Sequence, residues 1–427
     1  MKTQEPCVEM EKRKLGIDAL PAQVFEGLCH QPGAILLESQ KPSFTERYSF
    51  VAWQPEKVFR GDIVDLNRDD FFAFISNYSR DHLVAGYIGY EACQWIEELP
   101  RPGEKDRSTP DIYLAAYPRF LVFDHILQAW HSWHKDRPPK LPTVCKIKGT
   151  HRPGEFVGFN QGKEAYLRNV RNVLDYIKAG DVYQINYTQR VHYKYLGNPW
   201  NLYRRLKKIQ PVAYGAFINL GDGHIISGSP ELYLRLKNGK ILTKPMKGTT
   251  TRSRRPGIDR RLREELKRSV KDRAENTMIV DLMRNDLGRF CDYGSVGVPK
   301  LYVVEAYDTV YQMVSHVTGT VQGKIQPSNI IRSTFPPGSV TGAPKKRVME
   351  IIYELEPHQR GVYCGAVGCF FRDEMVLNVA IRTLELFNGK GVLGVGGGIV
   401  ADSDPESEYE ESILKAKASL MALGIEI

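Results

Sequence analysis

The sequence predicts an α+β fold in which helices pack outside antiparallel sheets. Asn238-Gly239 separates two segments that alternate with period two, and this is the signal for a tight hairpin. Helical patterns interrupt the strands in blocks rather than in strict alternation, which argues against a doubly wound parallel sheet. From residue 181 onward we expect strands over 181–247, 302–321 and 363–398 and helices over 260–289, 344–356 and 405–422.

The part of the chain before residue 160 carries shorter segments. We expect strands over 34–38, 48–53 and 120–123 and a helix near 71–80. Residues 135–160 are rich in proline, glycine and polar residues, which is typical of a surface connection. A helix over 164–177 follows and ends at Gly180. This pattern predicts an N-terminal subdomain over 1–140 and a catalytic region over 155–427, joined in one interlocked large domain.

Size and composition exclude several classes of protein. The 427 residues are 42% hydrophobic, which is enough for one large or two ordinary cores and excludes a disordered, fibrous or small disulfide-linked chain. The seven cysteines include no Cys-x-x-Cys pair, so we expect reduced, packed thiols. No segment reaches the roughly 20 apolar residues of a membrane span. We therefore expect a cytoplasmic protein with no membrane partner.

The net charge raises the question of an anionic partner. Lys and Arg number 59 against 50 Asp and Glu, a formal charge of +9. The densest basic run, from Arg252 to Arg273, also contains acids, as on a solvated helix face. We therefore expect no nucleic acid partner. A basic nucleic-acid-binding or scaffold protein without catalysis remains the alternative from a different class.

Glu231 and Lys247 are predicted to lie at the same end of the hairpin. Counting back from the turn pairs Glu231 with Met246, which places Lys247 diagonal to Glu231 across the ladder. An exposed salt bridge at the rim of the sheet would explain this pair without any function. A buried pair could instead act as a general acid and a lysine whose pKa is lowered.

Two glutamates are expected to point inward from different helices. Glu275 shares a helix face with Ile279 and Met283, and Glu411 lies at the edge of the apolar stripe of the last helix, which begins at Pro405. Two such carboxylates suit Mg²⁺, which uses one or two carboxylates together with waters and substrate oxygens. The helix dipole also stabilises acidic side chains near a helix N-terminus, so each glutamate alone could have a purely structural role.

Glycine-rich loops and one arginine could hold an anion. The loops are Gly394-Val-Gly-Gly-Gly398 and Gly338-Ser-Val-Thr-Gly342, and neither fits a dinucleotide or P-loop signature. Arg382 lies in an otherwise apolar strand, so its guanidinium needs a partner. That partner is either a carboxylate of a ligand, held by two hydrogen bonds, or an acid of the protein itself.

Taken together, these segments closely resemble the chorismate-utilising enzymes over residues 160–420. The matching stretches are Asp181-Val-Tyr-Gln-Ile-Asn186, Ser229-Pro-Glu231, Pro245-Met-Lys-Gly-Thr249, Ala274-Glu-Asn-Thr-Met-Ile-Val-Asp281, Arg284-Asn-Asp286, Gly338-Ser-Val-Thr-Gly-Ala-Pro-Lys345, Ile381-Arg-Thr383 and Gly396-Gly-Gly-Ile399 through Glu408-Tyr-Glu-Glu411. The resemblance implies the fold of anthranilate synthase component I, with antiparallel sheets stacked in a sandwich.

Two positions separate the reactions of this family. Isochorismate and salicylate synthases carry a lysine that activates water where this chain has Gln184, so the resemblance argues against water as the nucleophile. Anthranilate synthases usually have alanine at the position of Lys247, whereas aminodeoxychorismate synthases have lysine. The resemblance therefore implies amination of chorismate to 4-amino-4-deoxychorismate, a step towards para-aminobenzoate and folate. Anthranilate synthase is the nearest alternative.

The resemblance also implies a role for each matching residue. Glu231 would be the general acid on the C4 hydroxyl, and Lys247 would attack C2. Mg²⁺ would be the cofactor, bound by Glu275 and Glu411. The chorismate carboxylates would contact the remaining site residues, which are Gln184, Gly248, Thr249, Thr341, Tyr363, Arg382, Gly396, Gly397, Gly398 and Lys415.

Three further expectations concern partners and neighbouring residues. None of the seven cysteines lies in the setting of a glutaminase nucleophile, so ammonia is expected from a separate glutamine amidotransferase subunit. In this family the first part of the chain forms a tryptophan pocket, which Ser39 and Tyr48 match loosely. Many relatives have histidine at the position of Gln312, and we assign no catalysis to Gln312 or to His316.

Overall fold

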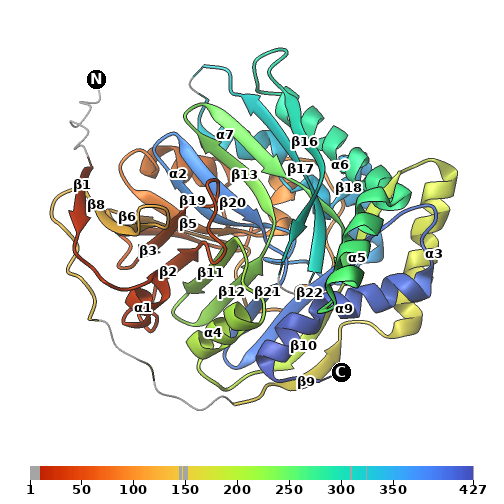
Figure 1. Ribbon diagram of the computed structural model, residues 1–427, viewed down its shortest axis with the longest axis horizontal. Coiled ribbons are helices and arrows are strands. Elements are labelled where there is room, and N and C mark those ends of the chain that lie inside the picture. The colour runs from red at the N-terminus through yellow and green to blue at the C-terminus, as the bar shows by residue number, and fades with distance from the viewer. Residues whose placement is uncertain (1–9, 144–146, 148–151, 308–309, 324, 427) are drawn as a thin grey trace.

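The computed structural model describes residues 10–143, 147, 152–307, 310–323 and 325–426. Two large sheets dominate it, and every strand pairing between named strands is antiparallel. Helices lie around the sheets, as Figure 1 shows. The predicted α+β class with antiparallel sheets is confirmed.

The first sheet has twelve strands, and β9 (Glu155–Phe159) pairs with β10 beside its main path. The other strands follow in the order β1 (Glu11–Leu15), β8 (Ala129–His134), β7 (Arg119–Asp124), β3 (Tyr48–Ala52), β2 (Ile35–Glu38), β11 (Tyr214–Asn219), β12 (Gly223–Ser229), β21 (Thr383–Phe387), β22 (Lys390–Ile399), β10 (Gln184–Lys194) and β18 (Gly342–Ala343).

The second sheet has ten strands, and β16 (Gly297–Ala306) pairs with β17 beside the main path. The order of the others is β15 (Met246–Thr251), β17 (Val310–Thr320), β14 (Lys240–Lys244), β13 (Leu232–Lys237), β20 (Glu374–Val379), β19 (Ala366–Phe371), β5 (Leu83–Ile88), β6 (Ile112–Tyr117) and β4 (Lys57–Gly61). Both sheets therefore combine strands from before and after residue 160.

The helices cover the outer faces of the sheets. They are α1 (Pro21–Glu26), α2 (Arg68–Tyr78), α3 (Lys163–Ala179), α4 (Pro199–Ile209), α5 (Pro256–Arg268), α6 (Val270–Gly288), α7 (Pro327–Thr334), α8 (Lys345–Leu355) and α9 (Pro405–Leu423), with short 3₁₀ turns at η1 (Tyr90–Trp95) and η2 (Gly338–Val340). No helix in these described segments is long and apolar enough to cross a membrane.

The core is built in layers that follow this arrangement. Residues of both sheets, such as Ile35, Tyr87 and Val367, pack together in one cluster between them. A second cluster packs α2, α3, α6, α7 and α8 against the sheets, and a third packs α1, α4 and α9 against the first sheet. Packing between these layers holds in place the ends of the strands on which the candidate site residues lie.

Two expectations about helices were wrong in detail. The strands expected over 181–247 are interrupted by α4, where Asn198 caps the helix by accepting from the N–H groups of Trp200 and Asn201 and Pro199 takes the first position. The single helix expected over 260–289 is two helices, because Ser269 ends α5 and caps α6 by accepting from the N–H of Asp272. The start of α6 lies against β15, where Asp272 packs on Gly248.

Cys93, Cys291, Cys364 and Cys369 are buried free thiols, and Cys29 is also buried. Cys7 and Cys145 lie outside the described residues.

Candidate active site

The hairpin of β13 and β14 brings Glu231 and Lys247 to the same end of the second sheet. Lys237 pairs with Lys240 as expected, but an irregularity before Arg235 shifts the register so that Leu232 pairs with Lys244. The pairing predicted for Glu231 was therefore one residue out. The Glu231 carboxylate nevertheless accepts a hydrogen bond from the Met246 N–H and interacts electrostatically with Lys247.

The environment favours a protonated acid beside a neutral amine. Glu231 is 4% exposed, and burial raises its pKa to about 7 against the opposing effects of a hydrogen bond to Ser339 and the charge of Lys247. Loss of solvent around the Lys247 amine lowers its pKa, while the negative charge of Glu275 opposes that shift. Both groups are therefore moved towards their neutral forms, which an exposed rim salt bridge would not show.

Gly398 of β22 lies next to both Lys247 and the side chain of Gln184. Strands β10 and β22 pair Asn186 with Gly398. A Cβ atom at Gly398 would lie 2.7 Å from Lys247 Nζ and 2.6 Å from Gln184 Nε2, so only glycine leaves room for both side chains. Gln184 is fully buried, and neither its Nε2 nor its Oε1 has a hydrogen-bond partner among the described residues. A buried amide without hydrogen-bond partners lowers the stability of the fold unless a ligand supplies the missing hydrogen bonds.

Arg382 is a second group without a full set of partners. Its Nη1 atom is buried and finds no hydrogen-bond acceptor in the described part of the chain, and desolvation lowers the pKa of its guanidinium. The charges that act on it are those of Tyr307 and Glu231. Its backbone has φ +52°, a conformation that an arginine adopts only where the surrounding structure holds it. The sequence left open whether an acid of the protein itself pairs with Arg382. Among the described residues, no acid forms a direct ion pair with Arg382.

Tyr363 and Thr341 are buried but already engaged. The Tyr363 ring lies against Gly394, where a Cβ atom would clash with it, rather than against Gly396, Gly397 or Gly398. The Thr341 hydroxyl donates to the Pro337 carbonyl at 2.6 Å, so its proton is not free for a ligand.

Three carboxylates approach each other on the solvent side of Lys247. Burial raises the pKa of Glu275 and of Glu408, and the charge of Lys271 acts on both in the opposite direction. Glu408 Oε2 would lie 3.2 Å and Glu411 Oε1 3.8 Å from a Cβ atom at Gly397. Glu408 was missed from the sequence, although it is three residues before Glu411 and therefore on the same helix face.

Lys415 neutralises part of this acidic group. Its Nζ lies 2.7 Å from Glu411 Oε1 and donates to the Gly396 carbonyl at 3.0 Å. The charge of Lys415 lowers the pKa of Glu411, so this carboxylate is ionised at neutral pH.

The carboxylates of Glu275, Glu408 and Glu411 are chemically suited to bind a hard divalent cation. Burial raises the pKa of Glu275 and Glu408 although the charge of Lys271 acts against the shift at both, and carboxylate oxygens are ligands that Mg²⁺ prefers. No three His, Cys, Asp or Glu side chains of the described residues are arranged as a complete ligand set. A cation here would need substrate oxygens or waters to complete its shell.

The turn after Lys247 adds backbone amides. Gly248 has φ +82°, and a Cβ atom there would lie 2.7 Å from the Asp272 carboxylate, so α6 packs directly on this turn. Thr249 is exposed and pairs with Gln312 on β17.

The Gln312 Oε1 atom is buried without a partner among the described residues, and His316 Nε2 lies 3.8 Å from Glu305 Oε1.

Ser39 and Tyr48 contact other residues than those of this group. The Ser39 hydroxyl donates to the Glu46 carbonyl at 2.7 Å, and the Lys237 Nζ lies 4.9 Å from the centre of the Tyr48 ring. The two residues line a small cavity together with Leu37, Tyr214 and Asn378. Tryptophan binding there stays a prediction.

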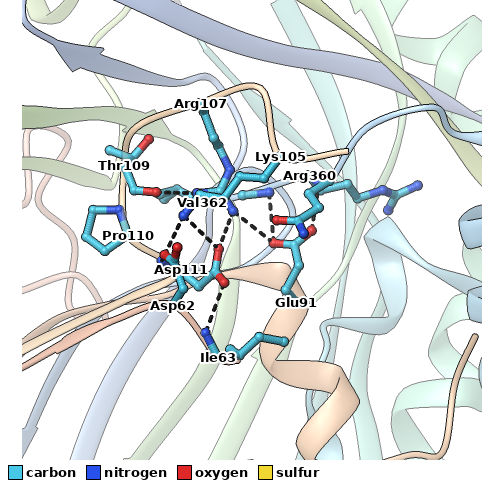
Figure 2. Close-up of polar contacts among 12 residues, drawn as sticks. Asp62, Ile63, Glu91, Lys105, Arg107, Thr109, Pro110, Asp111, Arg360 and Val362 are labelled. Atoms are coloured by element: carbon cyan, nitrogen blue, oxygen red, sulfur yellow. Dashed lines mark hydrogen bonds and ion pairs between the residues drawn. The ribbon is translucent and has the colours of Figure 1, made fainter. Parts of the chain in front are cut away.

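A buried ionic network supports the segment that carries Tyr363. Glu91 accepts from the backbone N–H groups of Arg360 and Gly361, and Figure 2 shows Arg107 and Arg360 beside Glu91. Burial raises the pKa of Glu91 to about 7 although Arg107 lies 3.4 Å away. The Arg360 guanidinium donates to the carbonyls of Val340 and Asn186, which ties this segment to the strand of Gln184.

Comparison with known proteins agrees with this site. Residues 32–421 match the family model described as chorismate binding enzyme. The chain is 38% identical to aminodeoxychorismate synthase component 1 of Klebsiella aerogenes over 93% of its own length and 95% of the relative's. It is also 38% identical to anthranilate synthase component 1 of Thermus thermophilus, over 80% of this chain and 77% of the relative.

Solved structures show the same fold. Anthranilate synthase component I from Streptococcus pneumoniae superposes with a TM-score of 0.79 at 30% identity, covering 89% of this chain and 93% of that one. The menaquinone-specific isochorismate synthase of Escherichia coli has a TM-score of 0.78 at 16% identity, covering 99% and 96%, and shares the fold alone. With a family model that spans most of its length, the chain belongs to the chorismate binding enzymes.

Proposed function

We propose that the protein is component 1 of an aminodeoxychorismate synthase, which converts chorismate and ammonia to 4-amino-4-deoxychorismate and water. The observation that carries the proposal is Lys247, a partly buried lysine with a lowered pKa next to a carboxyl whose pKa is about 7. Relatives of that name at 36–39% identity support it. The product would serve para-aminobenzoate and folate synthesis.

In the first step, the neutral Lys247 amine attacks C2 of chorismate. The two ring double bonds shift, the C4–O bond breaks, and Glu231 gives its proton to the departing hydroxyl, which leaves as water. Hydroxide is a poor leaving group, so a protonated carboxyl at this point lowers the barrier. The raised pKa of Glu231 supports this role.

In the second step, ammonia adds at C4, the double bonds return, and the bond between C2 and Lys247 breaks. The proton released from the new ammonium group returns to the Glu231 carboxylate, so the site is restored. Gln184 contributes no proton, because an amide cannot act as a base at neutral pH, and this disfavours attack by water. Its two unpartnered amide atoms could instead hydrogen-bond to the substrate.

The two carboxylates of chorismate would be held at opposite ends of the site. Arg382, with its unpartnered Nη1, is suited to the enolpyruvyl carboxylate, and the Gly396–Gly398 segment, Tyr363 and Thr341 would contact the same group. The ring carboxylate would contact the amides of Gly248 and Thr249 and the Lys415 ammonium. Magnesium, bound by Glu275 and Glu411 with Glu408 nearby, would supply positive charge against that ring carboxylate.

Ammonia would come from a separate glutamine amidotransferase subunit. The buried cysteines Cys29, Cys93, Cys291, Cys364 and Cys369 lack the exposure of a glutaminase nucleophile, and burial raises the thiol pKa of Cys93, Cys364 and Cys369 to about 12. The designation component 1 in the relatives supports a partner component. Reduced thiols also suit the cytoplasm.

Anthranilate synthase is the second candidate, because a relative of that name has the same 38% identity. Product analysis separates the two. The purified chain would be incubated with chorismate, Mg²⁺ and ammonium at alkaline pH, and the products resolved by chromatography. We expect 4-amino-4-deoxychorismate without fluorescence of anthranilate, whereas fluorescent anthranilate as the main product would refute the proposal.

A further inference from the structure

Two thirds of the net charge of the protein is concentrated in one short segment. Residues 252–273 contain ten Arg or Lys and four Asp or Glu, so they carry six of the nine net positive charges. Helix α5 occupies most of this segment, and Leu266 is its buried anchor. The charge therefore lies on α5 and on the residues that immediately precede and follow it.

Most of these cations have no acidic partner among the described residues. Asp259 pairs with Arg252 and Glu265 with Arg261. Of the other eight, Lys271 interacts with Glu408 and Glu411, and Arg273 lies over the Tyr302 ring. The remaining six are exposed and form no ion pair with any described residue, and we call them the basic surface: Arg254, Arg255, Arg260, Arg263, Lys267 and Arg268. Six unpaired cations on α5 and the residues just before it repel each other, which costs stability unless an anionic partner covers them.

The basic surface borders the exposed side of the candidate active site. Helix α5 packs on β15, the strand of Lys247, and continues through Ser269 into α6, the helix of Glu275. Thr249 and Lys415 are exposed on this side. Figure 1 shows α5 next to α6 and α9, on the opposite side of the molecule from β1.

The residue types favour contact with a protein. Eight of the ten basic residues in 252–273 are arginine, against 31 of 59 in the whole chain. Arginine is enriched and lysine depleted in protein interfaces. Two exposed apolar residues flank the basic surface, Ile258 at 44% exposure and Val270 at 83%. An interface with a polar rim and a few apolar contacts has this composition.

Long-range attraction of a small anionic substrate explains the basic surface less well than contact with a protein does. Residues 402–411 at the start of α9 contain six Asp or Glu and no Lys or Arg, and Glu408 and Glu411 of this segment interact with Lys271. Beyond a Debye length of about 8 Å the two segments largely cancel. A protein that lies directly on α5 would still meet the basic surface alone.

We propose that the basic surface docks an acidic face of the glutamine amidotransferase subunit, which places the source of ammonia beside Lys247 and Gln184. The inference rests on the proposed function, since that function requires ammonia. The acidic start of α9 would repel the same acidic face and so fix the orientation of the partner.

The test compares two double variants with equal changes of charge. Arg260→Glu/Lys267→Glu alters two exposed residues seven apart on α5, and Arg13→Glu/Lys14→Glu alters two exposed residues on β1. Each full-length protein would be assayed with ammonium alone and with glutamine plus its cognate amidotransferase subunit. Circular dichroism would verify that all three proteins are folded.

We expect ammonium-dependent activity to be the same in all three proteins. The amidotransferase concentration for half-maximal glutamine-dependent activity should rise about tenfold or more in the α5 variant and stay unchanged in the β1 variant. Equal half-saturation in the α5 variant and the wild type would overturn the proposal. Equal losses with ammonium and with glutamine would also overturn it, because the surface would then serve the substrate.

Two controls separate this proposal from its alternatives. If the wild type forms no aminated product from ammonium, the proposed function fails, and calorimetric titration of the amidotransferase subunit still tests docking directly. The third measurement is binding of a random duplex oligonucleotide. If only the α5 variant loses this binding and its glutamine-dependent activity stays intact, the basic surface binds nucleic acid and docking of the subunit is refuted.

Discussion

Lys247 and Gly398 are in direct contact across the two sheets: a Cβ atom at Gly398 would lie 2.7 Å from Lys247 Nζ. Lys247 lies on β15 of the second sheet and Gly398 on β22 of the first. The position of the lysine amine is therefore set by the absence of a side chain on a strand that is 151 residues away in the chain.

The Gly398→Ala variant should lose activity while keeping its fold. The new methyl group would displace the ends of two flexible side chains, Lys247 and Gln184, which are its nearest neighbours. A misplaced nucleophile lowers kcat by about a hundredfold, whereas the thermal midpoint should change little. Steady-state kinetics and a thermal melt check both. Gly162→Ala, which adds a methyl group in open space, serves as the control and should behave as the wild type.

The Glu231→Gln variant should be inactive and, at high pH, more stable than the wild type. The pKa of Glu231 is raised from 4.5 to about 7, so its carboxyl opposes folding as it ionises. That loss of stability develops as the pH rises from about 4.5 to 7 and amounts to about 3 kcal/mol above pH 7. Urea unfolding of both proteins at pH 5 and pH 8 measures it.

The amide that Glu231→Gln introduces has no proton to lose, so the variant's advantage in unfolding free energy should appear at pH 8 and disappear at pH 5. An advantage of equal size at both pH values would mean that ionisation of Glu231 is not its cause.

The Arg382→Met variant should bind chorismate more weakly but unfold less readily. The guanidinium is desolvated without an ion-pair partner among the described residues, so replacing it removes an unpaired charge from the interior. Loss of a charged hydrogen bond to a carboxylate of about 2 kcal/mol would raise KM roughly 30-fold. Kinetics and urea unfolding give the two values. An unchanged KM would exclude Arg382 from substrate binding.

The Glu275→Gln and Glu411→Gln variants should raise the Mg²⁺ concentration needed for half-maximal activity. Each removes one carboxylate charge from the group beside Gly397 and Lys247. Glu410→Gln, an exposed neighbour on α9, is the matched control. A magnesium titration of activity that is the same for all three variants would show that these carboxylates do not bind the metal.

Much of the site was predictable because its signals are local. The turn at Asn238-Gly239 fixed the end of the hairpin, and the N-cap at Asp404 with Pro405 fixed the start of α9, where Asp404 accepts from the Ser407 N–H at 2.9 Å. Such short-range patterns depend on neighbouring residues, which the sequence displays directly.

The remaining features depend on tertiary contacts. The irregularity before Arg235 that moved Glu231 by one position coincides with a second register shift where β13 pairs with β20, a strand that the hairpin alone does not contain. The approach of Glu408 to Glu275 arises because α6 packs on β15 of the second sheet and α9 on β22 of the first. Desolvation of Glu231 and Lys247, which sets their pKa values, is likewise a property of the whole fold.

The central claim is that Lys247 forms a covalent bond with C2 of chorismate. The most direct test is the intact mass of the full-length protein after brief incubation with chorismate and Mg²⁺ without ammonia, followed by acid quenching. We predict an added mass equal to chorismate minus one water, located on Lys247 by peptide mapping and absent from Lys247→Ala. An unmodified wild-type protein, or the same adduct in Lys247→Ala, would contradict this mechanism.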